Sequence, residues 1–193
     1  MMNSRMMKRP ILATIIALGL ASPLSAGTVE GLSAFARNDF AGAFRELLPE
    51  AKGGDAEAQI MLAILYAEGK GVRRDAAEAV VWLKQAAKVQ PDADYVLGDI
   101  YSQDPQLRDD AEAARAYRRA ADQGFAPAFS KIGMIYLSGT GVAIDPVEAV
   151  VWLSLAAERG APEVAAALQK ARAGLSPEEQ RKAQDLFTQR NRR

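Results

Sequence analysis

Apolar residues recur at helical spacing along most of the chain. In residues 55–90, two apolar runs with this spacing are separated by a short polar segment; the first is Ala58, Leu62, Ala63 and Tyr66, and the second is Ala79, Trp82, Leu83 and Ala86. Steps of three and four residues place each run on one face of a helix. The pattern therefore predicts a helix, a tight turn and a second helix.

The same hydrophobic pattern returns further along the chain. The hexapeptide EAVVWL occupies positions 78–83 and again 148–153, which is 70 residues later. Halfway between them, a degenerate copy places Tyr101 at 35 residues from both Tyr66 and Tyr136. Self-similarity at a period of roughly 20–50 residues is typical of proteins built from stacked repeats. We therefore predict three stacked units of about 35 residues each.

The segment between the two helices of a unit has residues that end one helix and begin the next. Gly69 and Gly71 suit the left-handed conformations found after a helix, and Asp75 stands at the N-cap position of the second helix. The small residue at position 63 is a glycine in the other two copies, which leaves room for a neighbouring helix. The Gly-Lys-Gly sequence at 69–71 is interpreted as a turn, because it lacks the strand and further glycines of a phosphate-binding loop.

The middle unit departs from this pattern in two ways. Its turn, SQDPQLRDD, has no glycine and is one residue shorter than the other two, and Ala116 replaces the repeated tryptophan. We expect Pro105 to make this turn, because proline fixes its own φ and ends the preceding helix. The space left by the missing indole must be filled by a neighbour. This unit is predicted to be the one that is locally weak or specialised.

Outside the three units the pattern degrades, as it does at the ends of a solenoid. Residues 27–54 are predicted to form an opening helix hairpin, and residues 161–193 two closing helices. The last helix should begin with a capping box made by Ser176 and Glu179. Terminal units with a polar outer face keep such a stack soluble. The predicted organisation is all-α, with stacked units at 55–90, 91–124 and 125–160.

The first 26 residues have the layout of a secretory signal peptide. Arg5, Lys8 and Arg9 precede an apolar run at 11–20, and small residues surround the expected cleavage site after Ala26. The apolar run is shorter than the roughly 20 residues of a membrane-spanning helix, so a retained anchor is the lesser alternative. Cleavage near Ala26 predicts a periplasmic or secreted protein that has no membrane span in its mature form.

Composition excludes several classes of chemistry. Cleavage would leave 21 basic and 24 acidic residues, a net charge of −3, without the clustered basic face that a nucleic-acid partner requires. The chain has no cysteine and no histidine, which excludes Ser-His-Asp triads, cysteine nucleophiles and zinc sites built from imidazole or thiolate. Asp92, Asp94 and Asp99 are interpreted as solvated charges, because the sequence marks no carboxylate pair across a cleft. We expect no cofactor, no metal and no catalytic residue.

The units also carry a family resemblance. The first and third contain AQIMLAILYAEGKGVRRDAAEAVVWLKQAA and APAFSKIGMIYLSGTGVAIDPVEAVVWLSLAAERG, and both resemble a Sel1-like repeat, a relative of the tetratricopeptide repeat with an extended turn. With the middle copy, the resemblance covers roughly residues 55–160. It implies a right-handed α-solenoid and a non-enzymatic scaffold for protein–protein contact in an exported bacterial protein. An adaptor or regulator of a protein partner in the cell envelope is therefore the leading hypothesis.

By analogy with tetratricopeptide proteins, the partner should bind the concave surface formed by the first helix of each unit. The positions projected onto that groove are Glu57, Ile60, Ile64, Tyr95, Asp99, Ser130 and Met134. This mixture suits an amphipathic helix or an extended peptide that carries a basic residue. In this hypothesis Tyr95 and Met134 anchor the partner, and Asp99 pairs with its charge. The alternative places Ile60, Ile64 and Met134 inside the stack, where apolar residues usually lie.

Two other function classes stay open. Some exported Sel1-like proteins have been described as β-lactamase-like, which suggests a cell-wall hydrolase or penicillin-binding-like protein. Those relatives are rich in cysteine, however, and Ser130 and Lys131 lack the Ser-x-x-Lys spacing. A structural subunit of an envelope assembly is the other class. Trp82 and Trp152 could anchor a ligand, but repeated aromatic residues at helical spacing are interpreted as core.

Overall fold

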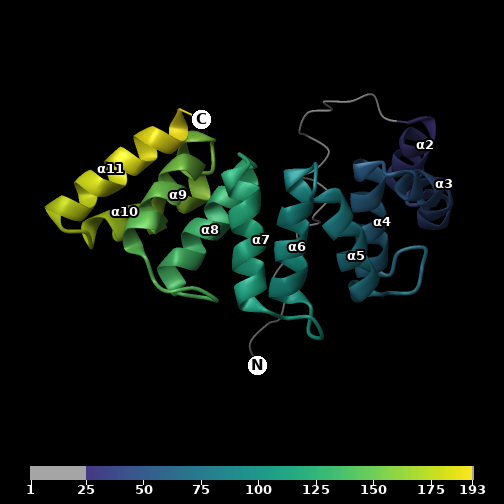
Figure 1. Ribbon diagram of the computed structural model, residues 1–193, viewed down its shortest axis with the longest axis horizontal. Coiled ribbons are helices and arrows are strands. Elements are labelled where there is room, and N and C mark those ends of the chain that lie inside the picture. Colours follow the sequence, from purple (N-terminus) through teal and green to yellow (C-terminus); the bar gives the residue numbers. More distant parts are fainter. Residues whose placement is uncertain (1–24, 193) are drawn as a thin grey trace.

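The structure, a computed structural model, describes residues 25–192. In this part of the chain the elements are α2 (Ala26–Ala36), α3 (Phe40–Gly53), α4 (Ala56–Glu68), α5 (Ala76–Ala86), α6 (Pro91–Gln103), α7 (Asp110–Asp122), α8 (Ala126–Ser138), α9 (Pro146–Glu158), the 3-10 helix η1 (Pro162–Val164), α10 (Ala165–Ala173) and α11 (Pro177–Asn191). Figure 1 shows the helices side by side in an arc, from α2 and α3 at one end to α11 at the other. The predicted signal peptide lies outside the described residues except for Ser25, the N-cap of α2, and Ala26.

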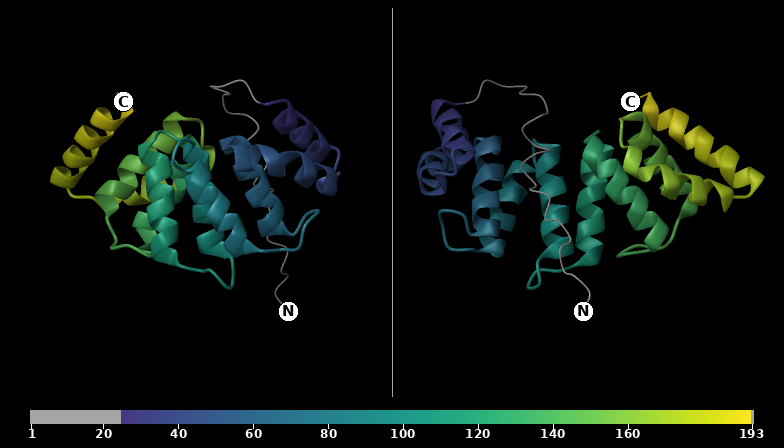
Figure 2. Two further views of the ribbon diagram at one scale, coloured as in Figure 1. Left: turned by 45° about the vertical axis from the view of Figure 1, so that its right-hand side comes forward. Right: turned by 180° about the vertical axis from the view of Figure 1, so that it is seen from behind.

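Successive helices pack as hairpins, and the pairs α4–α5, α6–α7 and α8–α9 are the three units. Their long inner turns lie along one edge of the array (Figure 1), and the same row of hairpins is visible from two other sides (Figure 2). Buried apolar residues form two clusters that meet at α7, so each hairpin shares its core with its neighbours. The predicted all-α solenoid of stacked helix hairpins is confirmed. Within residues 25–192, no helix has the length and apolar character needed to cross a membrane.

Local signals in the sequence set the ends of these helices. The carboxylate of Asp75 accepts a hydrogen bond of 3.0 Å from the backbone N–H of Glu78, which satisfies a donor in the first turn of α5. Gly69 ends α4 with a φ of 67°, and the same arrangement recurs in the third unit. Ser176 and Glu179 form the predicted capping box at the start of α11. The Gly-Lys-Gly segment is therefore a helix-ending turn, as predicted.

The glycines at the middle of α6 and α8 let the two helices of a hairpin come into close contact. A Cβ added to Gly98 would lie 2.6 Å from Cε1 of Tyr117, and one added to Gly133 would lie 2.8 Å from Cδ2 of Leu153. Real Cβ atoms do not come this close to a neighbour, so any larger residue would push the helices apart. The predicted close approach at these small residues is confirmed.

The turn of the middle unit is made differently from our expectation. Pro105 is exposed, and the side chain that organises the turn is Asp104, whose carboxylate accepts hydrogen bonds from the backbone N–H groups of Gln106 (2.9 Å) and Leu107 (3.1 Å). The same carboxylate forms an ion pair with Arg74 of the preceding unit. Burial alone would raise the pKa of Asp104, but these hydrogen bonds hold the pKa below its usual range. A buried aspartate therefore replaces the glycines of the other turns.

The two tryptophans of the repeated hexapeptide have different surroundings. Trp152 is 2% exposed, which confirms its predicted place in the core. Trp82 packs against the core but is only half-buried. In the middle unit, Ala116 is 0% exposed, so neighbouring residues close the space that the missing indole leaves.

Candidate protein-binding surface

The first helices of the units, α4, α6 and α8, carry all seven predicted groove residues. Four of these reach the surface: Met134 is 48% exposed, and Glu57, Tyr95 and Ser130 are half-buried. Asp92, at the start of α6, is half-buried as well. We call the accessible part of these helices the first-helix surface, and define it by Glu57, Asp92, Tyr95, Ser130 and Met134.

Ile60 and Ile64 belong to the core and not to a binding surface. Their exposed fractions are 0% and 2%, and every residue from Ala58 to Leu65 in α4 is buried. The alternative that the stack buries these residues is thus correct for both isoleucines. It is wrong for Met134, which we had grouped with them and which is exposed.

Asp99 is also buried, and its charge is already paired within the chain. Its Oδ1 atom lies 3.1 Å from Nζ of Lys131 in α8 and accepts a hydrogen bond of 2.6 Å from the hydroxyl of Tyr117 in α7. Burial and the carboxylate of Asp99 raise the pKa of Tyr117, so the phenol keeps the proton that it donates. The hypothesis that Asp99 pairs with a charge of the partner is therefore wrong, because Lys131 supplies that charge.

Lys131 is the residue of this network that the sequence analysis missed. Its ammonium group lies 5.7 Å from the ring centroid of Tyr95 and 5.4 Å from that of Tyr117, within the range of a cation–π contact. The signal was present in the register of the repeats, since the positions 35 and 70 residues earlier hold Val96 and Met61. A lysine at a position that is apolar in the other copies indicates that its charge is paired within the protein.

The carboxylates of α6 are not the solvated charges that we predicted. Asp94 is 2% exposed, and its Oδ1 atom lies 2.6 Å from Nη2 of Arg119 in α7. Asp99, at 5% exposure, is paired as described above. The two ion pairs therefore join α6 to its neighbours, Asp94 to α7 and Asp99 to α8. A buried carboxylate needs such a cation and hydrogen bonds to compensate its charge.

Glu57 and Asp92 are different, because no basic side chain among residues 25–192 forms an ion pair with either of them. Burial, together with repulsion from the carboxylates of Asp92 and Asp55, raises the pKa of Glu57 to about 7. Burial also raises the pKa of Asp92, against the hydrogen bond from the backbone N–H of Ala93. Two uncompensated acids from adjacent units thus face the same part of the first-helix surface.

This raised pKa predicts a pH-dependent effect of Glu57→Gln on stability. Below pH 4.5, the folded and unfolded states both hold the proton, so the substitution should change little. As the pH rises towards 7, the unfolded state loses the proton first, and the wild-type protein loses stability that the glutamine variant keeps. We expect the variant to be more stable by about 1–2 kcal/mol at pH 8, reduced from the full linkage value because the carboxyl is partly exposed.

Urea unfolding at pH 4 and pH 8 measures this difference. Glu30→Gln, at an exposed position of α2, provides the matched control for removing a glutamate charge from the surface. A Glu57→Gln variant that differs from wild type by the same amount at pH 4 and pH 8 would contradict the raised pKa.

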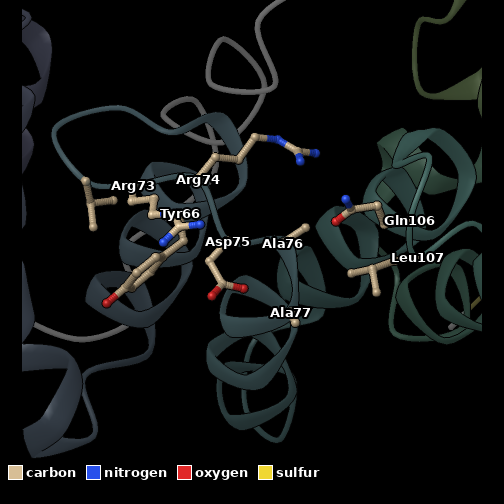
Figure 3. Close-up of a pocket in the computed structure, with 9 residues that line it drawn as sticks. Tyr66, Arg73, Arg74, Asp75, Ala76, Ala77, Gln106 and Leu107 are labelled. Atoms are coloured by element: carbon tan, nitrogen blue, oxygen red, sulfur yellow. The ribbon is translucent and has the colours of Figure 1, made fainter.

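A cleft of about 430 Å³ lies between the turns of the first and second units. In Figure 3, Tyr66, Arg73 and Asp75 lie on one side of this cleft, and Gln106 and Leu107 lie on the other. Asp75 is the one acidic residue among those that line the cleft, and it is engaged as the N-cap of α5. The lining residues therefore offer no carboxylate pair for acid–base chemistry. Within the described residues, no group of three or more acidic side chains could hold a metal ion.

Two relatives of this chain are alginate biosynthesis proteins named AlgK. The protein from Pseudomonas syringae pv. tomato is 34% identical over 138 residues, and that from Azotobacter vinelandii is 30% identical over 136 residues. Each match covers 67% of this chain and 28% of the relative. The chain thus spans little more than a quarter of the length of these relatives.

Two solved structures share the arrangement of helices. A Sel1 repeat protein from Oxalobacter formigenes is 34% identical with a TM-score of 0.57, and the match covers 65% of this chain and 96% of that one. A protective antigen of uropathogenic Escherichia coli with an SLR fold is 23% identical with a TM-score of 0.51, over 78% of this chain and 41% of that one. At this lower identity, the second likeness shows the fold alone.

The family model of the Sel1 repeat matches three segments, residues 56–88, 91–125 and 130–160. These segments coincide with the hairpins α4–α5, α6–α7 and α8–α9. Together they make up more than half of the chain. The chain therefore belongs to the Sel1 repeat family.

Proposed function

We propose that this protein is a non-enzymatic scaffold that binds a partner protein on the first-helix surface. Sel1 repeats generally mediate contacts between proteins, which supports this class of function. The observation that carries the choice of surface is the combination of an exposed apolar side chain, Met134, with the uncompensated carboxylates of Glu57 and Asp92. The partner segment should therefore be amphipathic and carry a lysine or arginine.

The accessible residues have distinct roles in this proposal. Met134 offers a flexible apolar contact of the kind used in adaptable interfaces. Tyr95 is held by ring contacts of 5.6 Å to Tyr117 and 5.4 Å to Phe125, so it presents a rigid aromatic edge. A cation of the partner would compensate Glu57 and Asp92 and favour their charged forms. Ser130 lies on α8, one helical turn before Met134, and adds a hydroxyl to the surface.

We also propose that the protein acts in the bacterial cell envelope, in the periplasm or after secretion. The support comes from the signal-like segment at 1–26 and from the similarity to AlgK proteins. The same similarity, to proteins named for alginate biosynthesis, favours a structural subunit of an envelope assembly as the second candidate function. That alternative predicts a stable complex that co-purifies with the chain at constant stoichiometry.

Met134→Glu tests the first-helix surface. We expect this variant to lose most of the partner captured from an extract of the host envelope, with affinity for the isolated partner about tenfold weaker, because the charge enters an apolar contact. Ile144 is the matched control, since it is 63% exposed but lies in the turn before α9. Ile144→Glu should retain the partner. Equal retention by both variants would show that the partner binds elsewhere.

A further inference from the structure

The hexapeptide EAVVWL lies in two helices of this protein, but its second valine and its tryptophan are fully covered in only one of them. In α9, Val151 is 0% and Trp152 is 2% exposed. At the equivalent positions of α5, Val81 is 50% exposed and Trp82 is half-buried. The sequence of the hexapeptide is the same, so the difference comes from what packs against it.

In the third unit, α11 covers the hexapeptide and brings an arginine to it. Nη1 and Nη2 of Arg190 each lie 2.8 Å from an oxygen of Glu148, in a bidentate ion pair. The same guanidinium group lies 4.7 Å from the ring centroid of Trp152, whose indole N–H donates a hydrogen bond of 2.9 Å to Glu148. Arg118 of α7 adds a longer ion pair, with its Nη1 atom 3.7 Å from Oε2 of Glu148. Arg190 thus makes the shorter contacts that orient the glutamate, and the glutamate satisfies the indole N–H.

In the first unit, these interactions are missing among residues 25–192. The indole nitrogen of Trp82 is buried without a hydrogen-bond partner, and Glu78 forms no ion pair. A buried donor without an acceptor costs about 1–3 kcal/mol, so the site would be stabilised by a group that turns Glu78 towards the indole. Val89, which is 70% exposed just beyond α5, extends the uncovered apolar surface.

We propose that the outer face of α5 is a second docking site, which binds an arginine-bearing amphipathic helix of a partner protein. The helix would lie on α5 as α11 lies on α9, with an apolar side chain over Val81 and its arginine between Glu78 and Trp82. This site differs from the first-helix surface and does not depend on it, because it is formed by the second helix of the unit.

The flanking residues of α5 further define the partner. Lys84 and Gln85 are exposed, whereas Ser154 and Leu155, their equivalents in α9, are buried. Lys84 should therefore pair with an acidic residue on the docked helix. Because Lys84 lies six residues after Glu78 on α5, that acidic residue should lie about two turns from the arginine of the docked helix. The second helix of the middle unit has no comparable site, since Arg115 stands in place of Val81.

A peptide with the sequence of residues 176–192 provides the probe, because α11 is a helix that already fits this hexapeptide. Titrated into the full-length protein labelled with ¹⁵N, it should shift the indole N–H signal of Trp82 in a saturable way. The signal of Trp152 should not move, since α11 of the same chain covers it. Trp82→Phe assigns the two signals. A peptide with Arg190→Gln should bind about tenfold more weakly, which is typical of a lost charged hydrogen bond.

Glu78→Gln in the protein should weaken binding of the native peptide to a similar extent. The matched control is Glu112→Gln, at the equivalent position of α7, which should leave the affinity unchanged. The proposal fails if the Trp82 signal does not move, if the Trp152 signal moves instead, or if Glu78→Gln and Arg190→Gln have no effect. A dimer of the chain that Glu78→Gln dissociates would also overturn it, because the occupant would then be a second copy.

Discussion

Replacing Tyr117 with alanine is expected to lower the free energy of unfolding by about 3–5 kcal/mol, the range for a large aromatic residue removed from a core. The ring is 2% exposed and fills the space over Gly98, where α6 and α7 are in close contact. Its hydroxyl donates a 2.6 Å hydrogen bond to Asp99. The substitution would therefore leave a cavity and also remove a donor from a buried carboxylate, and both effects destabilise the middle of the stack.

Tyr117→Phe separates these two effects, because it keeps the ring and removes only the hydroxyl. We expect a loss of about 1–3 kcal/mol for this variant, the cost of an unsatisfied buried hydrogen-bonding group. Urea unfolding followed by circular dichroism measures both variants under the same conditions. A loss below about 1 kcal/mol for Tyr117→Ala would mean that the ring is not part of the core.

The second large effect is expected at Gly141, in the turn of the third unit. Its φ is 73°, a conformation that costs an L-residue about 1 kcal/mol. A Cβ at this position would also collide with the carbonyl oxygen of Asp110 at the start of α7, and this backbone cannot move aside without shifting the helix. We expect Gly141→Ala to lower the free energy of unfolding by about 2–4 kcal/mol, as the sum of the conformational cost and overpacking.

Gly124 is the matched control for the conformational part of this cost. Its φ is 85°, but a Cβ there would have no neighbour within 4 Å. Gly124→Ala should therefore cost only about 1 kcal/mol. Thermal or urea unfolding of the two variants gives the difference between them, which reports the contact of the turn with the preceding unit. Equal losses at Gly141 and Gly124 would contradict the close approach.

The contact at Gly141 also shows how the units are held in register. Gly71, at the equivalent position of the first unit, lies in the same way against the backbone of Phe40 in α3. Ion pairs join the units as well, between Arg74 and Asp104 and between Lys131 and Asp99. Both proposed surfaces thus belong to a framework whose units are held relative to one another by backbone contacts and ion pairs.

Much of the fold could be predicted from the sequence because its signals are local. The 35-residue period, the glycines of the turns and the N-cap aspartates each act over a few residues, and the helices begin and end where these signals are found. The exception is the middle turn, where Pro105 was the more obvious signal. There the carboxylate of Asp104 is decisive, because it bonds to its own turn and to Arg74 of the preceding unit.

The candidate surface was predicted less well, because exposure depends on neighbours that lie far away in the sequence. Ile60 and Ile64 have the spacing of groove residues, yet the packing of the stack buries both. Asp99 also has the spacing of a groove residue, but Lys131 from the next unit forms an ion pair with it. Glu57 and Met134 remain on the surface, and no local pattern distinguishes them from the residues that are buried.

The sequence by itself determined that this protein is a stack of helix hairpins, since periodicity and turn chemistry are properties of each unit alone. Only the tertiary structure decided which residues of the identical hexapeptides are accessible. Trp152 is enclosed by α11 and its arginine, whereas Trp82 is only half-buried and its buried indole N–H has no hydrogen-bond partner among the described residues. The physical reason is that burial and charge compensation are supplied by the next element in space, which a repeated sequence does not encode.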